Sequence, residues 1–150
     1  MSFSIAFTEE KIPSGWIDRN EKASMATITI GDFVERHLVP LNFWTIEDYR
    51  KQWLTAVSRF MQEGNAVLIT EMYDPKEANF IKGWSLKKST KGRVDIINCI
   101  FFLDEIASFD SNNLHRFAHH TLEDTSEVSH WEIAVDDLKY WQSTLQDQPG

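Results

Sequence analysis

Three histidines near the end of the chain come closest to a reactive site, because acidic residues follow them directly. They are His115, His119 and His120. A helix would place His115 and His119 on one face, a spacing that suits zinc, and Glu123 or Asp124 could supply a further ligand. Histidines in an acidic surface loop are the simpler interpretation, so we expect no metal and no cofactor. A small metal-dependent hydrolase that uses the His115–Glu127 region is the alternative.

The other residue types that often carry catalysis lack suitable surroundings. Cys99, the single cysteine, lies inside the apolar run Val94–Leu103, which predicts a buried and inert thiol. The sequence contains neither a serine nucleophile elbow nor a glycine-rich phosphate loop. Acidic neighbours on a strand would point to opposite faces, and the pair Asp136 and Asp137 is explained by Asp136 capping a helix. We therefore predict that the protein is not an enzyme.

The chain of 150 residues carries a net charge of −8, which is unevenly placed. Residues 1–100 hold 13 acidic and 13 basic residues, whereas residues 101–150 hold 10 acidic residues against Arg116 and Lys139 alone. An acidic surface repels nucleic acid and anionic membranes, so neither is expected as a direct partner. It favours a basic partner, or simply solubility. The one basic cluster, interpreted as a solvated hairpin end, comprises Lys87, Lys88, Lys91 and Arg93.

The stretch from Thr45 to Gly64 has the strongest helical pattern in the sequence. Its apolar side chains recur at spacings of three and four and share one stripe; they are Ile46, Tyr49, Trp53, Val57 and Phe60. Thr45 is a suitable N-cap, Asp48 is its partner in a weak capping box, and Gly64 is suited to end the helix. We predict that the aromatic face of this helix packs on a sheet.

Apolar segments separated by turns predict that sheet. They indicate strands near Phe3–Phe7, Met25–Ile30, Phe33–Val39, Ala66–Met72, Phe80–Leu86, Val94–Leu103 and Trp131–Val135, and a last helix near Asp136–Gln146. The run Val94–Leu103 is apolar on both faces, which is typical of a central strand covered on both sides. The order predicts an α+β fold, a mainly antiparallel β-sheet with a long central helix and a C-terminal helix packed on it. Residues 1–150 are predicted to form a single domain.

Six tryptophans are many for a chain of this length. Trp53 and Trp141 lie on apolar helix faces, and most of the six are expected in the core. Trp16 follows the turn Pro13–Gly15 and is expected to be exposed, where its indole would anchor a partner.

Features of the whole chain predict a cytoplasmic location. Apolar runs fall well short of the roughly 20 residues of a membrane span. The N-terminal residues lack the basic and apolar regions of a signal peptide. A single cysteine allows no internal disulfide, which suits a reducing compartment.

Four segments are distinctive enough to compare with known families. They are PLNFWTIEDYRKQW (Pro40–Trp53), LITEMYDPKEANFIKGWSL (Leu68–Leu86), IFFLDE (Ile100–Glu105) and HWEIAVDDL (His130–Leu138). They resemble segments of bacterial immunity proteins of contact-dependent growth inhibition systems, the CdiI type. The shared residues Tyr49, Trp53, Phe80 and Trp84 are of core type, so they define a fold rather than a site.

The resemblance implies a function. Each immunity protein of this type neutralises the toxic C-terminal domain of its cognate CdiA effector. We therefore expect a bacterial, cytoplasmic inhibitor that binds such a toxin domain one to one and performs no turnover. A general protein-interaction module is a further alternative. The resemblance assigns no binding residue in this sequence.

The acidic last third is our own candidate for the contact surface. Toxin domains of such systems are often nucleases, and a nuclease needs a basic cleft to hold phosphates. Carboxylates can mimic those phosphates, speed the encounter and occlude the cleft. We expect the contact residues to be Asp104, Glu105, Asp110, Glu123, Asp124, Glu127 and Trp16. An RNase is the preferred target.

Overall fold

The computed structural model describes residues 2–16, 21–103 and 130–146. In chain order the described elements are β1 (Phe3–Phe7), β2 (Ala23–Ile30), β3 (Phe33–Pro40), α1 (Ile46–Glu63), β4 (Asn65–Glu71), β5 (Phe80–Lys88), β6 (Arg93–Phe102), β7 (His130–Ala134) and α2 (Val135–Gln146). All the predicted strands and helices occur, with small differences at their ends.

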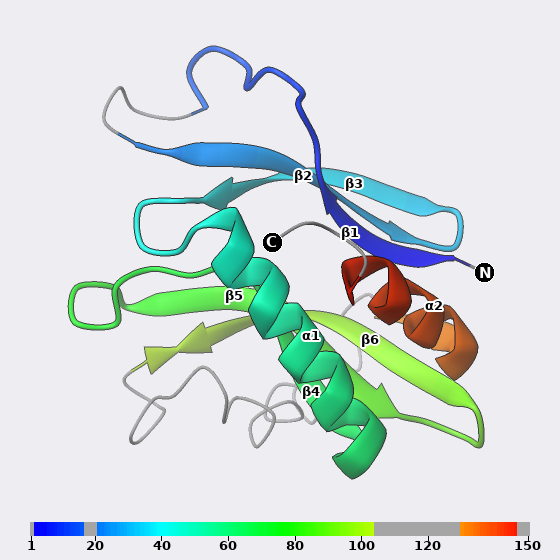
Figure 1. Cartoon of the computed structure of the whole chain (residues 1–150). Coiled ribbons are helices and arrows are strands. Elements are labelled where there is room, and N and C mark those ends of the chain that lie inside the picture. The colour runs from blue at the N-terminus through cyan, green and yellow to red at the C-terminus, as the bar shows by residue number, and fades with distance from the viewer. Residues whose placement is uncertain (1, 17–20, 104–129, 147–150) are drawn as a thin grey trace.

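The strands form two antiparallel sheets, ordered β1-β2-β3 and β4-β5-β6-β7. Figure 1 shows the first sheet above the second, with α1 and α2 in front of both. A single cluster of buried apolar residues draws on both sheets and both helices. The predicted α+β class is confirmed, with the strands divided between two sheets around one core.

The ends of α1 are fixed by local interactions that the sequence predicts. The Thr45 hydroxyl accepts a hydrogen bond from the Asp48 backbone N–H at 3.1 Å, and the Asp48 carboxylate accepts one from the Thr45 N–H at 2.9 Å. At the other end Gly64 adopts a φ of 83°, and its N–H donates to the Phe60 carbonyl. The capping box and the glycine cap are therefore both present.

Helix α1 lies along the free edge of β4, so it does more than cover a sheet face. The Gln52 side-chain amide donates to the Val67 carbonyl at 2.8 Å and accepts from the Ile69 N–H at 2.9 Å. The Trp53 indole N–H donates to the Ile69 carbonyl, also at 2.8 Å. An open strand edge would pair with another chain, and these buried side chains prevent that.

The hydroxyl of Tyr49 ties the two sheets together near the start of α1. It donates to the carbonyl of Pro40 at the end of β3, at 2.6 Å, and accepts from the Met72 N–H just after β4, at 3.1 Å. Burial raises the pKa of Tyr49 well above its usual value. The phenol therefore stays neutral and serves the fold.

Aromatic rings fill the core between the sheets and helices. The Trp53 indole stacks on Phe7 at a centroid distance of 5.5 Å and lies 5.9 Å from Trp141 of α2. Trp141 in turn meets Phe3 of β1 edge to face at 5.0 Å. Among the tryptophans, Trp53, Trp84 and Trp141 are buried and Trp44 and Trp131 are half-buried. Most of the six therefore lie in or against the core, as predicted.

Gly83 of β5 lies where the backbones of β4 and β5 come closest. A Cβ at this position would lie 2.5 Å from the Leu68 carbonyl oxygen and 3.1 Å from a Val67 methyl group. We expect Gly83→Ala to lower the free energy of unfolding by about 2 kcal/mol, because rigid backbone must move. Gly15→Ala, where a Cβ meets nothing within 4 Å at a φ of +88°, should cost about 1 kcal/mol. Equal losses in urea unfolding would show that crowding at Gly83 is unimportant.

The start of α2 differs from the prediction. The helix begins at Val135, and the Asp137 carboxylate, rather than Asp136, accepts a hydrogen bond from the Ala134 N–H at 3.2 Å. The expected cap at Asp136 is therefore wrong: the helix starts one residue earlier, so Asp136 lies inside its first turn. Asp137, the third residue of the helix, instead binds the N–H of Ala134, which directly precedes the helix.

Candidate functional site

The described residues contain no group of three histidine, cysteine or acidic side chains that could hold a metal ion. The proposed hydrolase region His115–Glu127 lies outside the described residues. So do six of the predicted contact residues, namely Asp104, Glu105, Asp110, Glu123, Asp124 and Glu127. The structure therefore does not test the positions of the hydrolase region or of these six contact residues. In the part of the chain that it describes, no helix is both long enough and apolar enough to span a membrane.

Cys99 is buried, with 3% of its surface exposed, and its thiol donates to the Ile97 carbonyl at 3.6 Å. The predicted burial is confirmed. A thiol in this position is shielded from solvent and from substrates, so it belongs to the packing of β6.

His37 of β3 is the unusual titratable group among the described residues. Both of its ring nitrogens are buried, and neither has a hydrogen-bond partner. Burial lowers the pKa of His37 from 6.5 to about 4, because the charged imidazolium would lose its hydration. The imidazole is therefore neutral at neutral pH.

The lowered pKa predicts an acid-sensitive fold. Between about pH 6.5 and pH 4 the unfolded chain binds a proton at His37 and the folded chain does not, so stability falls as the pH falls. We expect the variant His37→Leu to lose less stability than the parent protein between pH 7 and pH 5 in urea unfolding. His130→Gln, which changes an exposed histidine, is the control. Identical pH profiles for parent and His37→Leu would contradict this account.

The clearest exposed apolar surface lies at the end of β6. Ile100 and Phe102 alternate along the strand on one face and are 44% and 48% exposed. Phe80 of β5 pairs with Phe102 and lies half-buried beside it. We call Phe80, Ile100 and Phe102 the apolar strip. Its exposure corrects the prediction that β6 is covered on both sides along its whole length.

Polar residues beside the apolar strip contact one another and the Phe80 ring. The Lys82 ammonium lies 3.8 Å from the Glu71 carboxylate and 5.8 Å from the centre of the Phe80 ring. The Tyr73 hydroxyl donates to the same carboxylate at 3.0 Å, and its ring meets Phe80 edge to face at 5.8 Å. The charged groups of Lys82 and Glu71 beside the apolar strip thus pair with each other.

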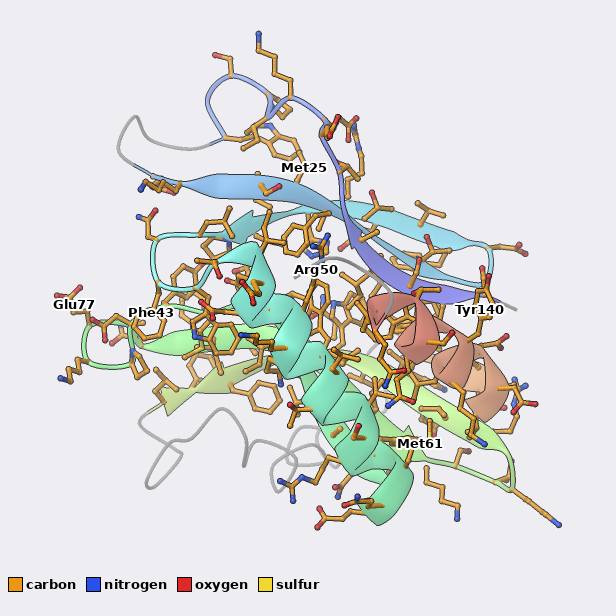
Figure 2. The ribbon with its side chains drawn as sticks, in the orientation of Figure 1. Met25, Phe43, Arg50, Met61, Glu77 and Tyr140 are labelled. Atoms are coloured by element: carbon orange, nitrogen blue, oxygen red, sulfur yellow. The ribbon has the colours of Figure 1, made fainter. Side chains whose placement is uncertain are left out.

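Other large apolar side chains are exposed one at a time. Trp16, the described member of the predicted contact set, is 50% exposed beside its turn, where its N–H donates to the Pro13 carbonyl at 3.3 Å. The predicted exposure is confirmed, and its role in binding stays a prediction. Phe43 of the β3–α1 loop, Met61 of α1 and Tyr140 of α2 lie well apart (Figure 2).

Comparison with known proteins identifies the family. Residues 39–141 match the family described as the CdiI N-terminal domain, which is more than half of the chain. The chain belongs to this family. It is 29% identical over 131 residues to the immunity protein CdiI of Enterobacter cloacae, covering 85% of this chain and 90% of that protein. The structure also matches one from the complex of CdiA-CT toxin and CdiI immunity protein of Enterobacter cloacae, with a TM-score of 0.82, 25% identity and coverage of 97% and 99% of the two chains.

The CdiI family match helps to separate fold residues from site residues. Of the core-type residues in the shared segments, Tyr49, Trp53 and Trp84 are buried, whereas Phe80 is only half-buried and belongs to the apolar strip. The matched range begins at residue 39, so β1 and β2 lie outside it. The apolar strip lies inside it.

Sequence patterns missed the apolar strip for an identifiable reason. Alternation shows that a strand has two apolar faces, but it does not show how far the covering layer extends. The available signal is that Ile100 and Phe102 lie within four residues of an acidic pair at residues 104 and 105. An apolar group bordered by charge is the pattern of a contact surface.

Proposed function

We propose that this protein binds and neutralises the toxic C-terminal domain of a cognate CdiA effector and acts as a stoichiometric inhibitor. The observation that carries the proposal is the likeness, over 97% of the chain, to a structure from a toxin and immunity complex. The described residues support it in a second way, since their buried cysteine, histidine and tyrosine serve packing rather than chemistry.

The apolar strip supplies the centre of the proposed interface. Protein contacts owe most of their affinity to a few apolar or aromatic anchors that lose water completely, surrounded by a polar rim. Ile100 and Phe102 are exposed anchors on a rigid strand, and Phe80 adds to the same surface. A standard interface of about 1,600 Å² with such anchors reaches nanomolar affinity or better.

The acidic residues of the last third supply the proposed rim. Asp104 and Glu105 follow Phe102 in the sequence after a single intervening residue, Leu103. A nuclease toxin, an RNase in our preferred form, would present a basic cleft to which carboxylates are attracted over a distance of about one Debye length. We infer that the carboxylates speed the encounter and occlude the cleft, while the apolar strip slows dissociation.

Charge reversal tests the acidic rim. We expect the combined variant Glu123→Lys, Asp124→Lys and Glu127→Lys to slow association with the toxin domain about tenfold at low salt, because electrostatic attraction sets the on-rate. Its association should also depend less on salt. Glu9→Lys, Asp32→Lys and Glu77→Lys make the same change of net charge at exposed positions elsewhere and serve as the control. Equal slowing in both variants would show that net charge alone matters.

Co-expression tests the function itself. We expect the neighbouring upstream gene to encode a very large exoprotein, whose C-terminal domain should stop growth when expressed alone. We expect co-expression of this protein to restore growth, and the two proteins to copurify. Growth arrest that persists despite soluble immunity protein would refute the proposal.

A further inference from the structure

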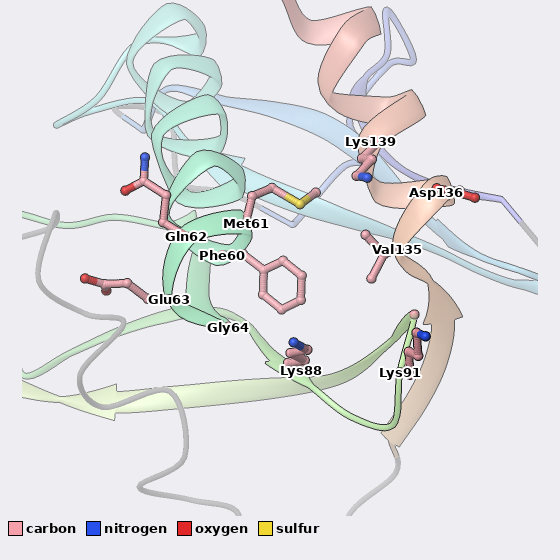
Figure 3. A pocket seen from close by; sticks show the side chains of 11 residues that line it. Phe60, Met61, Gln62, Glu63, Gly64, Lys88, Lys91, Val135, Asp136 and Lys139 are labelled. Carbon is pink, nitrogen blue, oxygen red and sulfur yellow. The ribbon is translucent and has the colours of Figure 1, made fainter.

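A pocket of about 560 Å³ lies at the end of the molecule opposite the apolar strip. It is formed where the last turn of α1, the hairpin between β5 and β6, and the first turns of α2 meet (Figure 3). Its lining includes Gly92, directly before β6, whereas the apolar strip includes Phe102 at the other end of that strand. Phe102 lies ten positions along the strand from Gly92, a distance of roughly 30 Å.

Three lysines border this pocket in a protein of net charge −8. Lys88 and Lys91 come from the hairpin, and pairing of β6 with β7 brings Lys139 of α2 to the same place. None of the three forms an ion pair with a carboxylate in residues 2–16, 21–103 or 130–146. Lys88 and Lys91 are exposed, as the interpretation of a solvated hairpin end predicts, and Lys139 adds a third charge beside them.

Among the described residues, the acidic side chains of the lining do not pair with these lysines. Glu63 lies 3.6 Å from the Arg59 guanidinium on its own helix, and Figure 3 shows it on the far side of α1. Asp136 points outward from the first turn of α2, where a helix N-terminus favours a carboxylate. The three lysine side chains are therefore available to bind an anionic ligand.

The floor of the pocket is apolar. Phe60 is buried and Val135 is half-buried, and the flexible Met61 side chain, 36% exposed, extends from α1 toward α2 (Figure 3). A Val135 N–H bond to the Gly92 carbonyl, at 2.9 Å, fixes the helix to the hairpin. The pocket combines a preformed apolar base with mobile cationic groups, and its volume is in the range that holds two or three side chains.

We propose that this pocket binds a short acidic peptide segment of a second protein, with an apolar side chain on the floor and carboxylates on the three lysines. Lysine ammonium groups are point charges without the fixed fork that arginine offers to phosphate, so they suit carboxylates of variable spacing. A long nucleic acid would also cross the acidic remainder of the surface, whereas a short segment is confined to the pocket. This inference does not depend on the proposed function, because the apolar strip lies at the other end of β6.

Fluorescence anisotropy with a labelled peptide Glu-Asp-Leu-Glu-Asp tests the proposal on the full chain. We expect saturable binding at low salt, and no binding of the matched peptide Gln-Asn-Leu-Gln-Asn. The variant Lys88→Gln, Lys91→Gln and Lys139→Gln should weaken binding at least tenfold, and Met61→Gln severalfold. Lys22→Gln, Lys76→Gln and Lys87→Gln remove the same charge from exposed positions outside the pocket and should leave binding unchanged.

Four outcomes would overturn the proposal. They are absence of binding at millimolar peptide, equal loss in both triple variants, displacement of the peptide by millimolar inorganic phosphate, and a pocket variant that is less stable to urea but binds the peptide normally. The last outcome would mean that the lysines only stabilise the C-terminus of α1 through their interaction with the helix dipole, since the last turn of α1 contains no basic residue of its own.

Discussion

Replacing Ile100 and Phe102 with threonine should weaken binding of the cognate toxin domain by more than a hundredfold. Each side chain is a large exposed apolar group on a central strand, and loss of one interface anchor typically costs about 2 kcal/mol or more. Threonine keeps the preference for strand structure, so the sheet should persist. Surface plasmon resonance should show the change mainly as faster dissociation.

Val34→Thr is the matched control for this experiment. Val34 is 60% exposed on β3 of the other sheet, and it loses the same kind of apolar surface. We expect its affinity for the toxin domain to stay within about twofold of the parent protein, since isolated surface residues contribute little. An Ile100→Thr and Phe102→Thr variant that binds as tightly as Val34→Thr would remove the apolar strip from the interface.

Replacing Gln52 with methionine should lower the free energy of unfolding by about 3 kcal/mol. Methionine has a similar shape but offers the β4 edge no strong hydrogen-bond donor or acceptor, so the Val67 carbonyl and the Ile69 N–H lose their side-chain partner. A buried polar group without a partner costs about 1 to 3 kcal/mol. Urea unfolding followed by tryptophan fluorescence measures the loss.

Gln62→Met makes the same exchange at an exposed position in the last turn of α1 and should change stability by less than about 0.5 kcal/mol. We also expect Gln52→Met to aggregate more readily, because part of the β4 edge loses its cover. Equal stability of the two variants would show that the hydrogen bonds of Gln52 contribute nothing net.

The predictable parts of the fold depend on interactions between residues that are near in sequence. Thr45 and Asp48 bond to each other at the start of α1, and Gly64 bonds to Phe60 at its end. Each contact spans only three or four residues, so the sequence pattern is sufficient to predict it. The position of α1 depends instead on Gln52 reaching β4 more than a dozen residues later. In the sequence Gln52 is a polar residue beside the apolar stripe of the helix, and nothing local predicts that it is buried. Its burial is explained only by the edge of β4, to which its side chain hydrogen-bonds.

The candidate sites show the same limit. Exposure of Trp16 follows from a local turn and was predictable. The basic pocket joins Lys88 to Lys139 across the β6–β7 pairing, and no local pattern relates residues so distant in sequence. The extent of the apolar strip depends on where neighbouring layers end, which periodicity does not record.

A titration of toxin activity tests the central claim most directly. The purified toxin domain, at a concentration well above the dissociation constant, is mixed with increasing amounts of this protein, and the residual activity of the toxin on its own substrate is measured. Inhibition by a tight one-to-one complex predicts a linear fall that reaches zero at one equivalent. Complete inactivation by a small fraction of an equivalent would indicate turnover, and full activity at several equivalents would indicate that this protein does not inhibit the toxin.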